Sequence, residues 1–351
     1  MKRSRRSVRI HETSKQWRRL LKGDEVRFGI FIGGATHVGV IPGIVVAAER
    51  LGYDSFWVSD HLFLPSVFYE AVGMDPEKGE CPVLEAWTTL SAAAAVTKKI
   101  MLGVGVTPLP LRDPAIVAKQ VATIDYISGG RVIFGAGAGW NRREFEAYGI
   151  RWDSHPVRIA KMLEGLEVIK RLWTQPIASY HGRYYKLSEA PLWPKPFQKP
   201  HPPIWFGGTS QSIMEATVQY GDGWVPYCPT VEEFKERFSK LENMIEKAGR
   251  CAKEIVPACV LLAHIASDLN AARNAIEPII KLRGSRTLKP EKWEEAEETI
   301  VYGGADDCIS KIEKYLKIGV KHILLEMISP KEALNCIKLF GERVLPYFKQ
   351  Q

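Results

Sequence analysis

The stretch SGGRVIFGAGAGWNRRE, from Ser128 to Glu144, decides how the rest of the chain is interpreted. A short apolar strand at 131–134 runs directly into a loop with glycine at positions 135, 137 and 139. Glycines at the carboxyl end of a buried strand let a planar or phosphorylated ligand approach the main chain closely. The spacing departs from the G-x-G-x-x-G fingerprint, because the third glycine stands at 139 and Trp140 follows it. We therefore predict a cofactor loop, but not a Rossmann-type dinucleotide site.

Around this loop, β-branched runs alternate with amphipathic segments. The runs predict eight strands, at 26–32, 55–59, 100–106, 131–134, 203–206, 223–226, 257–265 and 322–327. Strands that alternate with helical segments indicate a parallel sheet with crossover helices. Eight such units in 351 residues predict an α/β fold, a (β/α)8 TIM barrel, with its active site at the carboxyl ends of the strands. An open, doubly wound sheet is the alternative.

Three connections are longer than simple loops, and they follow predicted strands 2, 4 and 7. They span 62–82, 175–202 and 284–302. The second reads as a hairpin at 178–187 that turns at Gly182, followed by a proline-rich strap. The third is charged and favours a solvated helix. Because long loops in compact domains are usually functional or disordered, we expect the insertions to cover the barrel mouth and shape a substrate pocket.

The net charge of +8 comes from one end of the chain. Residues 1–23 hold nine Lys/Arg against Glu12 alone, which is 9 − 1 = +8, so the remaining 328 residues sum to zero. We expect 1–25 to be a basic, disordered tail and 26–348 to form the barrel domain, with no nucleic-acid partner. The sequence shows neither an apolar run of about 18 residues nor a secretory signal, so no membrane association is expected. Its six dispersed cysteines form no metal motif, which predicts free thiols, no metal and a cytoplasmic location.

Candidate site residues stand at the ends of the predicted strands. Asp60 and His61 follow strand 2, where a carboxylate can bind a cofactor edge and an imidazole can exchange a proton. Gly207, Gly208 and Thr209 follow strand 5 and open a helix, which suits a phosphate group. Plain turn formation at Asp60 and N-capping at the helix remain alternatives. The prolines and glycines of 104–113 indicate a bulge or a strained peptide that presses the backbone against a ring system.

In these motifs the chain resembles the luciferase-like family of flavin- and deazaflavin-dependent oxidoreductases, which are TIM barrels. The resemblance is carried by AERLGYDSFWVSDH (48–61), LEAWTTLSAAAAVTKKIMLGVGV (84–106), PLPLRDPAIVAKQVATIDYISGGRVIFGAGAGWNRREFEAYG (108–149), PKPFQKPHPPIWFGG (194–208) and YGDGW (220–224). It implies a tricyclic ring against strand 3, with a non-prolyl cis peptide at Val104–Gly105. It also implies roles for single residues: His61 catalytic, and Asp60, Val104, Gly105, Thr107, Gly137, Ala138, Gly207, Gly208 and Thr209 binding the cofactor.

The resemblance leaves three functions open. The first is hydride transfer between coenzyme F420 and a small organic substrate, with His61 relaying a proton. The second is a two-component monooxygenase that uses FMNH2 from a separate flavin reductase and acts on an aldehyde, a sulfonate or a similar compound. The third is a flavin carrier without turnover, which the presence of both Asp60 and His61 disfavours. The resemblance also implies a homodimer. The alanine run in 83–97 could pack on a second copy or, equally, form a tight helix–sheet contact within one subunit.

Overall fold

The computed structural model describes residues 25–33, 41–79, 83–284 and 293–349, so almost all of the basic segment 1–25 lies outside it. Eight parallel strands close into a barrel in the order β1-β2-β3-β5-β8-β9-β10-β12, and β12 pairs with β1. Their bounds are β1 Arg27–Ile32, β2 Ser55–Val58, β3 Met101–Val104, β5 Val132–Gly137, β8 Ile204–Phe206, β9 Gly223–Trp224, β10 Val256–Ile265 and β12 His322–Met327. Each matches one of the eight predicted strands, which confirms the barrel and excludes the open sheet.

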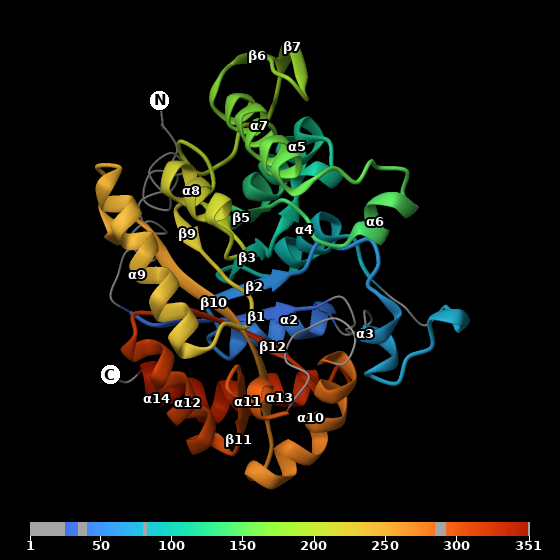
Figure 1. Cartoon of the computed structure of the whole chain (residues 1–351), viewed down its shortest axis with the longest axis vertical. Helices are drawn as coiled ribbons and strands as arrows, with labels where there is room; N and C mark the ends of the chain where they lie inside the picture. Colours follow the sequence, from blue (N-terminus) through green and yellow to red (C-terminus); the bar gives the residue numbers. More distant parts are fainter. Residues whose placement is uncertain (1–24, 34–40, 80–82, 285–292, 350–351) are drawn as a thin grey trace, which may run out of the picture.

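Helices surround the barrel (Figure 1). The longer ones are α2 Ile41–Arg50, α4 Ala86–Val96, α5 Pro114–Ser128, α7 His155–Thr174, α8 Gln211–Tyr220, α9 Val231–Lys247, α10 Leu269–Gly284 and α12 Ala305–Lys317. The short ones are α3 Ser66–Glu70, α6 Arg142–Ala147, α11 Trp293–Glu297, α13 Ala333–Leu339 and α14 Leu345–Lys349, with a π-helical turn at Phe340–Val344 and 3-10 turns at Pro76–Lys78, Leu109–Leu111 and Ala252–Glu254. Among the described residues, no helix has the length and apolarity to cross a membrane.

Large aromatic side chains fill the interior of the barrel. The rings of Trp57 and Trp205 are both fully buried, and their centroids lie 5.1 Å apart. The Trp57 indole N–H donates to Ser55 Oγ at 2.8 Å, and that oxygen lies 2.7 Å from His322 Nε2. Because this packed layer leaves little room, a ligand has to bind at one end of the barrel.

The third predicted strand is interrupted rather than continuous. β3 ends at Val104, and the chain rejoins β5 as the two-residue strand β4 Thr107–Pro108. Gly103 pairs with Ile133, and Thr107 pairs with Ala136. Between these pairs the β3–β4 stretch advances four residues while β5 advances three. The β3–β4 stretch therefore contains one extra residue, as in a β-bulge.

The non-prolyl cis peptide lies at Gly105–Val106, so the prediction of Val104–Gly105 is wrong by one bond. The Gly105 N–H still donates to Val58 O at 3.0 Å, which keeps Gly105 in the ladder with β2. The chain therefore leaves the sheet only after Gly105.

The long connections differ from each other in placement. The predicted hairpin exists as β6 Ile177–His181 and β7 Lys186–Pro191, and the N–H groups of Tyr184 and Tyr185 donate to Glu164 on α7, each at 2.8 Å. It lies on the outer side of α7 (Figure 1), so the hairpin part of this insertion does not cover the strand ends as expected. The first insertion contributes α3. In Figure 1, α3 and α6 lie on the same side of the barrel, the side toward which the arrow of β2 points.

The described part of the third insertion is packed against the protein, whereas a solvated helix was expected. Its residues 285–292 lie outside the described part. Trp293 and Ala296 on α11 are buried against α10. An additional strand, β11 Ile300–Gly303, extends the sheet beside β10.

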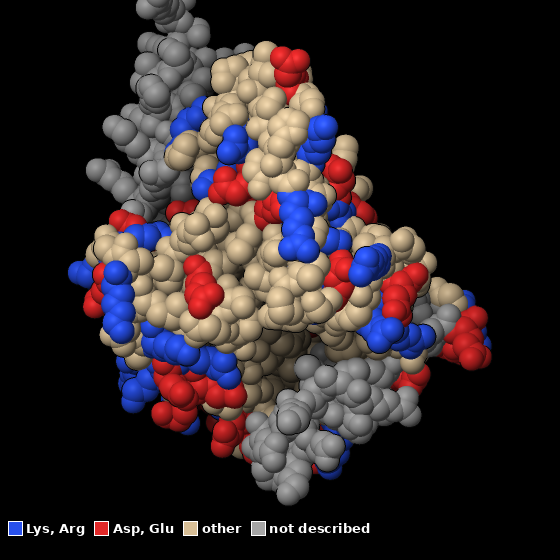
Figure 2. All heavy atoms as spheres, turned by 45° about the horizontal axis from the view of Figure 1, so that its top comes forward, with Lys and Arg blue, Asp and Glu red and all other residues tan. Residues whose placement is uncertain are grey.

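The charges of the described chain are mixed in sign. Figure 2 shows Lys/Arg and Asp/Glu side chains interspersed on the face turned forward, without a continuous patch of either sign.

Candidate functional site

The predicted site residues gather at the carboxyl end of the barrel because they follow neighbouring parallel strands. Asp60 and His61 follow β2, Gly137 ends β5 and Ala138 follows it, and Gly207 to Thr209 follow β8. β2 reaches β5 through β3, and β5 pairs directly with β8. The prediction that these strand ends form one rim is therefore confirmed.

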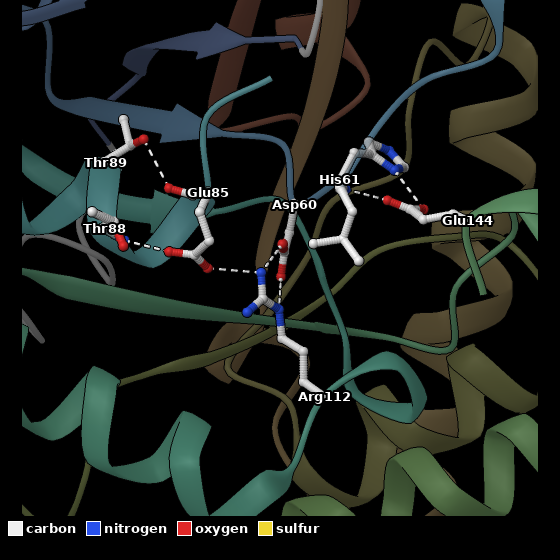
Figure 3. A network of polar contacts seen from close by, with 8 residues as sticks. Asp60, His61, Glu85, Thr88, Thr89, Arg112 and Glu144 are labelled. Atoms are coloured by element: carbon white, nitrogen blue, oxygen red, sulfur yellow. Dashed lines mark hydrogen bonds and ion pairs between the residues drawn. The ribbon is translucent and has the colours of Figure 1, made fainter. Parts of the chain in front are cut away.

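His61 is held at this rim by a glutamate that the sequence analysis did not single out. Its Nδ1 lies 3.1 Å from Oε2 of Glu144 on α6, and the other carboxylate oxygen accepts the N–H of Leu62 (Figure 3). The carboxylate is 2% exposed, whereas the His61 side chain is 16% exposed. The ring packs edge-on against Trp140 with the centroids 5.6 Å apart. His61 is thus anchored on one edge and accessible to solvent.

Asp60 turns in a different direction and forms a closed ion-pair network (Figure 3). Arg112 bonds both of its oxygens, Nε to Oδ2 at 2.8 Å and Nη2 to Oδ1 at 2.5 Å. The same Nη2 lies 2.8 Å from Oε1 of Glu85, the residue that caps α4 by accepting the N–H of Thr88. Burial opposes the charge of Arg112, yet Asp60 and Glu85 raise the pKa of its guanidinium above the ordinary value. The Asp60 side chain has no exposed surface.

Beside this network, the main chain at Gly135, Gly137 and Gly207 surrounds the side chain of Val106; we call this surface the main-chain ledge. A Cβ at Gly137 would come within 2.4 Å of Val106 Cγ2, and one at Gly207 within 2.9 Å of Val106 Cγ1. A Cβ at Gly135 would meet the Val104 carbonyl oxygen at 2.0 Å. The ends of β5 and β8 therefore accept only glycine here, and their main chain lies against Val106. A ledge of this kind suits the face of a flat ring.

Three members of the predicted cofactor set on strand 3 differ in access. The side chains of Val104 and Thr107 are fully buried. A Cβ at Gly105 would come within 2.7 Å of the Phe31 ring, so this residue also contacts the interior. Of these three residues, only the main chain can therefore border a ligand at the rim.

The predicted phosphate loop has a favourable environment. Gly208 adopts φ +109°, a left-handed conformation that favours glycine, and its carbonyl accepts the Trp224 indole N–H at 2.8 Å. Ser210 caps α8 by accepting the N–H of Ile213. Arg237 of α9 donates to the carbonyl of Thr209 at 3.1 Å. The start of a ten-residue helix and a guanidinium therefore lie together, and both attract an anion.

A further carboxylate, that of Glu326, lies near this end of the barrel. It follows His322 and Leu324 at two-residue spacing on β12, so it faces the interior as they do. The Tyr227 hydroxyl donates to its Oε2 at 2.9 Å, and a Cβ at Gly33 would come within 2.2 Å of its Oε1.

Sequence reasoning missed Glu326, Arg112, Glu144 and Arg237. Glu326, Arg112 and Glu144 share one sequence signal, a charged residue near a strand end or close to the start of a helix, whereas Arg237 lies inside α9 and has none. Within the described ranges, no cluster of three or more His, Cys, Asp or Glu side chains is arranged to hold a metal ion.

Comparisons with known proteins place the chain in a family. Residues 26–322 match the luciferase-like monooxygenase family, so the chain belongs to it and is an enzyme, an oxidoreductase or a monooxygenase. The F420-dependent glucose-6-phosphate dehydrogenase of Amycolatopsis mediterranei (strain U-32) is 27% identical over 321 residues, which are 86% of this chain and 92% of that protein.

The FMNH2-dependent dimethylsulfone monooxygenase of Pseudomonas putida is also 27% identical, over 290 residues, with 76% of this chain and 79% of that protein covered. A solved F420-dependent secondary alcohol dehydrogenase, in complex with an F420-acetone adduct, superposes with a TM-score of 0.78 at 25% identity over 92% of this chain and 98% of that chain. Relatives of both cofactor classes thus share 27% identity with this chain.

Proposed function

We propose that this enzyme is a coenzyme F420-dependent oxidoreductase that transfers hydride between the deazaflavin and a small organic substrate. The observation that carries the proposal is the His61–Glu144 pair at the rim. Reducing a carbonyl or an enone by hydride transfer also requires a proton, and a solvent-accessible imidazole anchored through its other nitrogen is suited to supply it. The F420-dependent relatives support the cofactor choice.

The described residues fit a deazaflavin or a flavin. The ring would lie on the main-chain ledge around Val106, and we propose that Gly105, Gly137 and Ala138 border it. The phosphate would bind Gly207, Gly208 and Thr209 at the start of α8, with Arg237 beside it. We propose that Asp60 acts on the cofactor site through Arg112, because Arg112 is the more exposed partner of the pair, at 14% against 0%.

The bound deazaflavin would supply the hydride chemistry. The chain contributes placement and a proton. Glu144 holds one edge of the His61 ring, and Trp140 packs against it, so the imidazole has a fixed position at the rim. Buried aromatic residues close the barrel below the site and exclude water from that side.

The alternative is a monooxygenase that uses FMNH2, with a separate flavin reductase as its partner, and the Pseudomonas relative favours it. In either case we propose a cytoplasmic homodimer. The exposed Ala92, Ala95 and Val96 of α4, together with Ile116 on α5, offer a small-residue and apolar face for a second copy. Sedimentation of the wild-type chain and of Ile116→Glu tests this.

The cofactor is identified by anaerobic titration with F420 and with FMN, each oxidised and reduced, followed by protein fluorescence and cofactor absorbance. Tighter binding of F420, followed by its oxidation or reduction with a panel of neutral alcohols, ketones and enones, is the expected result. A preference for reduced FMN together with oxygen uptake would replace the proposal by the monooxygenase. Binding of neither would contradict both.

The phosphate site is tested by Arg237→Gln. Loss of a charge-assisted contact to phosphate is worth about 1.5–3 kcal/mol, so we expect about 10-fold or greater weakening of whichever cofactor binds. Lys235→Gln on the same helix is the matched control, because its exposed side chain has no recorded contact with Thr209. Equal affinities of the two variants would show that the phosphate lies elsewhere.

A further inference from the structure

The surroundings of the Glu144 carboxylate limit which nitrogen of His61 carries the proton. One oxygen accepts the main-chain N–H of Leu62, and the other lies 3.1 Å from Nδ1 of His61. A carboxylate is only an acceptor when ionised, so the hydrogen on this edge of the ring belongs to Nδ1. The lone pair of a neutral ring then resides on Nε2, on the opposite edge.

We propose that Glu144 is a positioning residue that fixes the Nδ1–H tautomer of His61 and leaves Nε2 as the nitrogen that exchanges a proton with the substrate. The inference rests on the proposed function for the substrate step only. The tautomer itself depends on three described groups: the ring, the carboxylate and the Leu62 amide. Within the described residues no hydrogen-bond partner is recorded for Nε2, as Figure 3 illustrates for the drawn network.

The Leu62 amide makes Glu144→Gln a decisive variant. This N–H can only donate, so a glutamine must direct its carbonyl oxygen to Leu62 and its NH2 group to His61 Nδ1. Nδ1 then has to accept, and the ring proton moves to Nε2. A nearly isosteric substitution should therefore reverse the tautomer instead of merely weakening a contact. Glu144→Asp retains two acceptor oxygens on a shorter side chain and should retain the wild-type tautomer.

A matched control exists on the same short helix. Glu146 is also in α6, its side chain is 49% exposed, and it pairs with Arg142 at 2.8 Å. Glu146→Gln thus makes the same chemical change two residues away, with no recorded contact to His61. Any general effect of losing a carboxylate from α6 appears in both variants.

The test is long-range 1H–15N correlation of the imidazole rings in full-length protein labelled with 15N-histidine. Spectra are recorded at about pH 8.5, where an ordinary imidazole is neutral. The chain has eight histidines, and loss of one ring's signals in His61→Asn assigns His61. The expected result is protonated Nδ1 in wild type, Glu144→Asp and Glu146→Gln, and protonated Nε2 in Glu144→Gln. Protonated Nε2 in wild type, or an unchanged tautomer in Glu144→Gln, would overturn the inference.

Turnover of oxidised F420 with neutral alcohols provides the second readout, because in this direction the lone pair of His61 Nε2 would accept the hydroxyl proton while the hydride goes to the cofactor. Replacing a carboxylate that orients a catalytic histidine by its amide gives the wrong tautomer and can lower kcat by up to about 10⁴-fold, so Glu144→Gln should lower kcat by about 10-fold or more with KM little changed. Thermal unfolding of each variant separates this effect from loss of fold. A reversed tautomer with unchanged kcat would leave the role of Glu144 standing and refute the proton transfer by His61. The two proposals therefore fail in distinguishable ways.

Discussion

Asp60 and His61 are adjacent in sequence just after one strand, yet they differ in burial and in the side chains that they contact. Asp60 is a fully buried carboxylate with both oxygens bonded to Arg112. His61 reaches the rim, with one edge held by Glu144 and part of its ring accessible. Successive side chains at a strand end point in different directions, so one residue secures the framework while the next faces the site.

This difference shows which titratable groups can exchange a proton with a substrate and which are fully engaged by other side chains. The Asp60–Arg112–Glu85 network is closed, because the one guanidinium is paired with two carboxylates of the protein. The His61–Glu144 pair is open on the side of the imidazole that faces away from the carboxylate. A closed network stabilises geometry, and an open pair exchanges protons. Substitutions in the Asp60–Arg112–Glu85 network should therefore change mainly stability, and substitutions in the His61–Glu144 pair should change mainly turnover.

The largest change in stability is expected from Arg112→Leu. It leaves the Asp60 carboxylate buried without its counter-charge, and breaking a buried pair in this way costs about 3–5 kcal/mol of unfolding free energy. Urea unfolding measures it. Protonation of Asp60 removes the unpaired charge, so the deficit should shrink as the pH is lowered.

Two further variants make that prediction specific. Asp60→Asn combined with Arg112→Leu should recover part of the lost stability, because no charge is then buried. Arg142→Leu removes a pair whose side chains are 67% and 49% exposed, and it should change stability by less than about 1 kcal/mol. Similar losses for Arg112→Leu and Arg142→Leu would contradict the distinction between a closed network and a surface pair.

The largest change in activity is expected from His61→Asn. Removing a general acid or base typically lowers turnover by about 10²–10⁴-fold, while the fold should change little because the ring is partly exposed. Steady-state kinetics with F420 and the substrate panel give the rate, and thermal unfolding gives the stability. His155→Asn, at an exposed position in the first turn of α7, is the control. Retention of more than half of the turnover in His61→Asn would remove His61 from the mechanism.

The barrel was predictable from sequence because its signal is local and repeated. Each of the eight strands is an apolar run followed by an amphipathic segment, and their order around the barrel follows the order in sequence. β11 was missed because its four residues follow a charged segment and pair only with the end of an unusually long β10.

The site was predictable in outline but not in its partners. Strand ends identified His61 and the glycines, yet Glu144 stands 83 residues from His61 in a charged run that looks solvated. Its burial follows from the way the glycine loop meets the end of β2, which no local pattern encodes. The same holds for Arg112, which stands 52 residues from Asp60.

A second histidine, His322, extends the comparison into the barrel interior. Burial, with a smaller effect of Arg27, lowers its pKa to about 3, against an ordinary value of 6.5. The unfolded chain therefore binds this proton more readily, so the stability that His322 contributes is complete above about pH 6.5 and is lost as the pH falls toward 3. From pH 7 to pH 5 the loss is about 2 kcal/mol.

Two measurements check the interior histidine. The His322 ring should show no titration by NMR between pH 8 and pH 5. The stability of His322→Gln should also fall less steeply over that range than that of the wild type. His155→Asn should retain the wild-type slope, since its ring is exposed. A His322 resonance that titrates near pH 6 would show that the interior admits the charged ring.

The smallest effect is expected from Glu85→Gln, at the edge of the closed network. Burial opposes the charge of Glu85, but the Thr88 N–H and Arg112 together lower its pKa. Glutamine retains an acceptor for the Thr88 N–H and loses only the attraction to Arg112, which for a side chain 34% exposed is worth about 0.5–1 kcal/mol.

Because the pKa of Glu85 is lowered on folding, its charge stabilises the protein above the ordinary carboxyl pKa of about 4.3 and ceases to do so as the pH falls below it. Urea unfolding at pH 7 and pH 3.5 should therefore show a difference from wild type that is present at the higher pH and smaller at the lower one. A loss as large as that of Arg112→Leu would show that Glu85, rather than Asp60, is the main partner of the guanidinium.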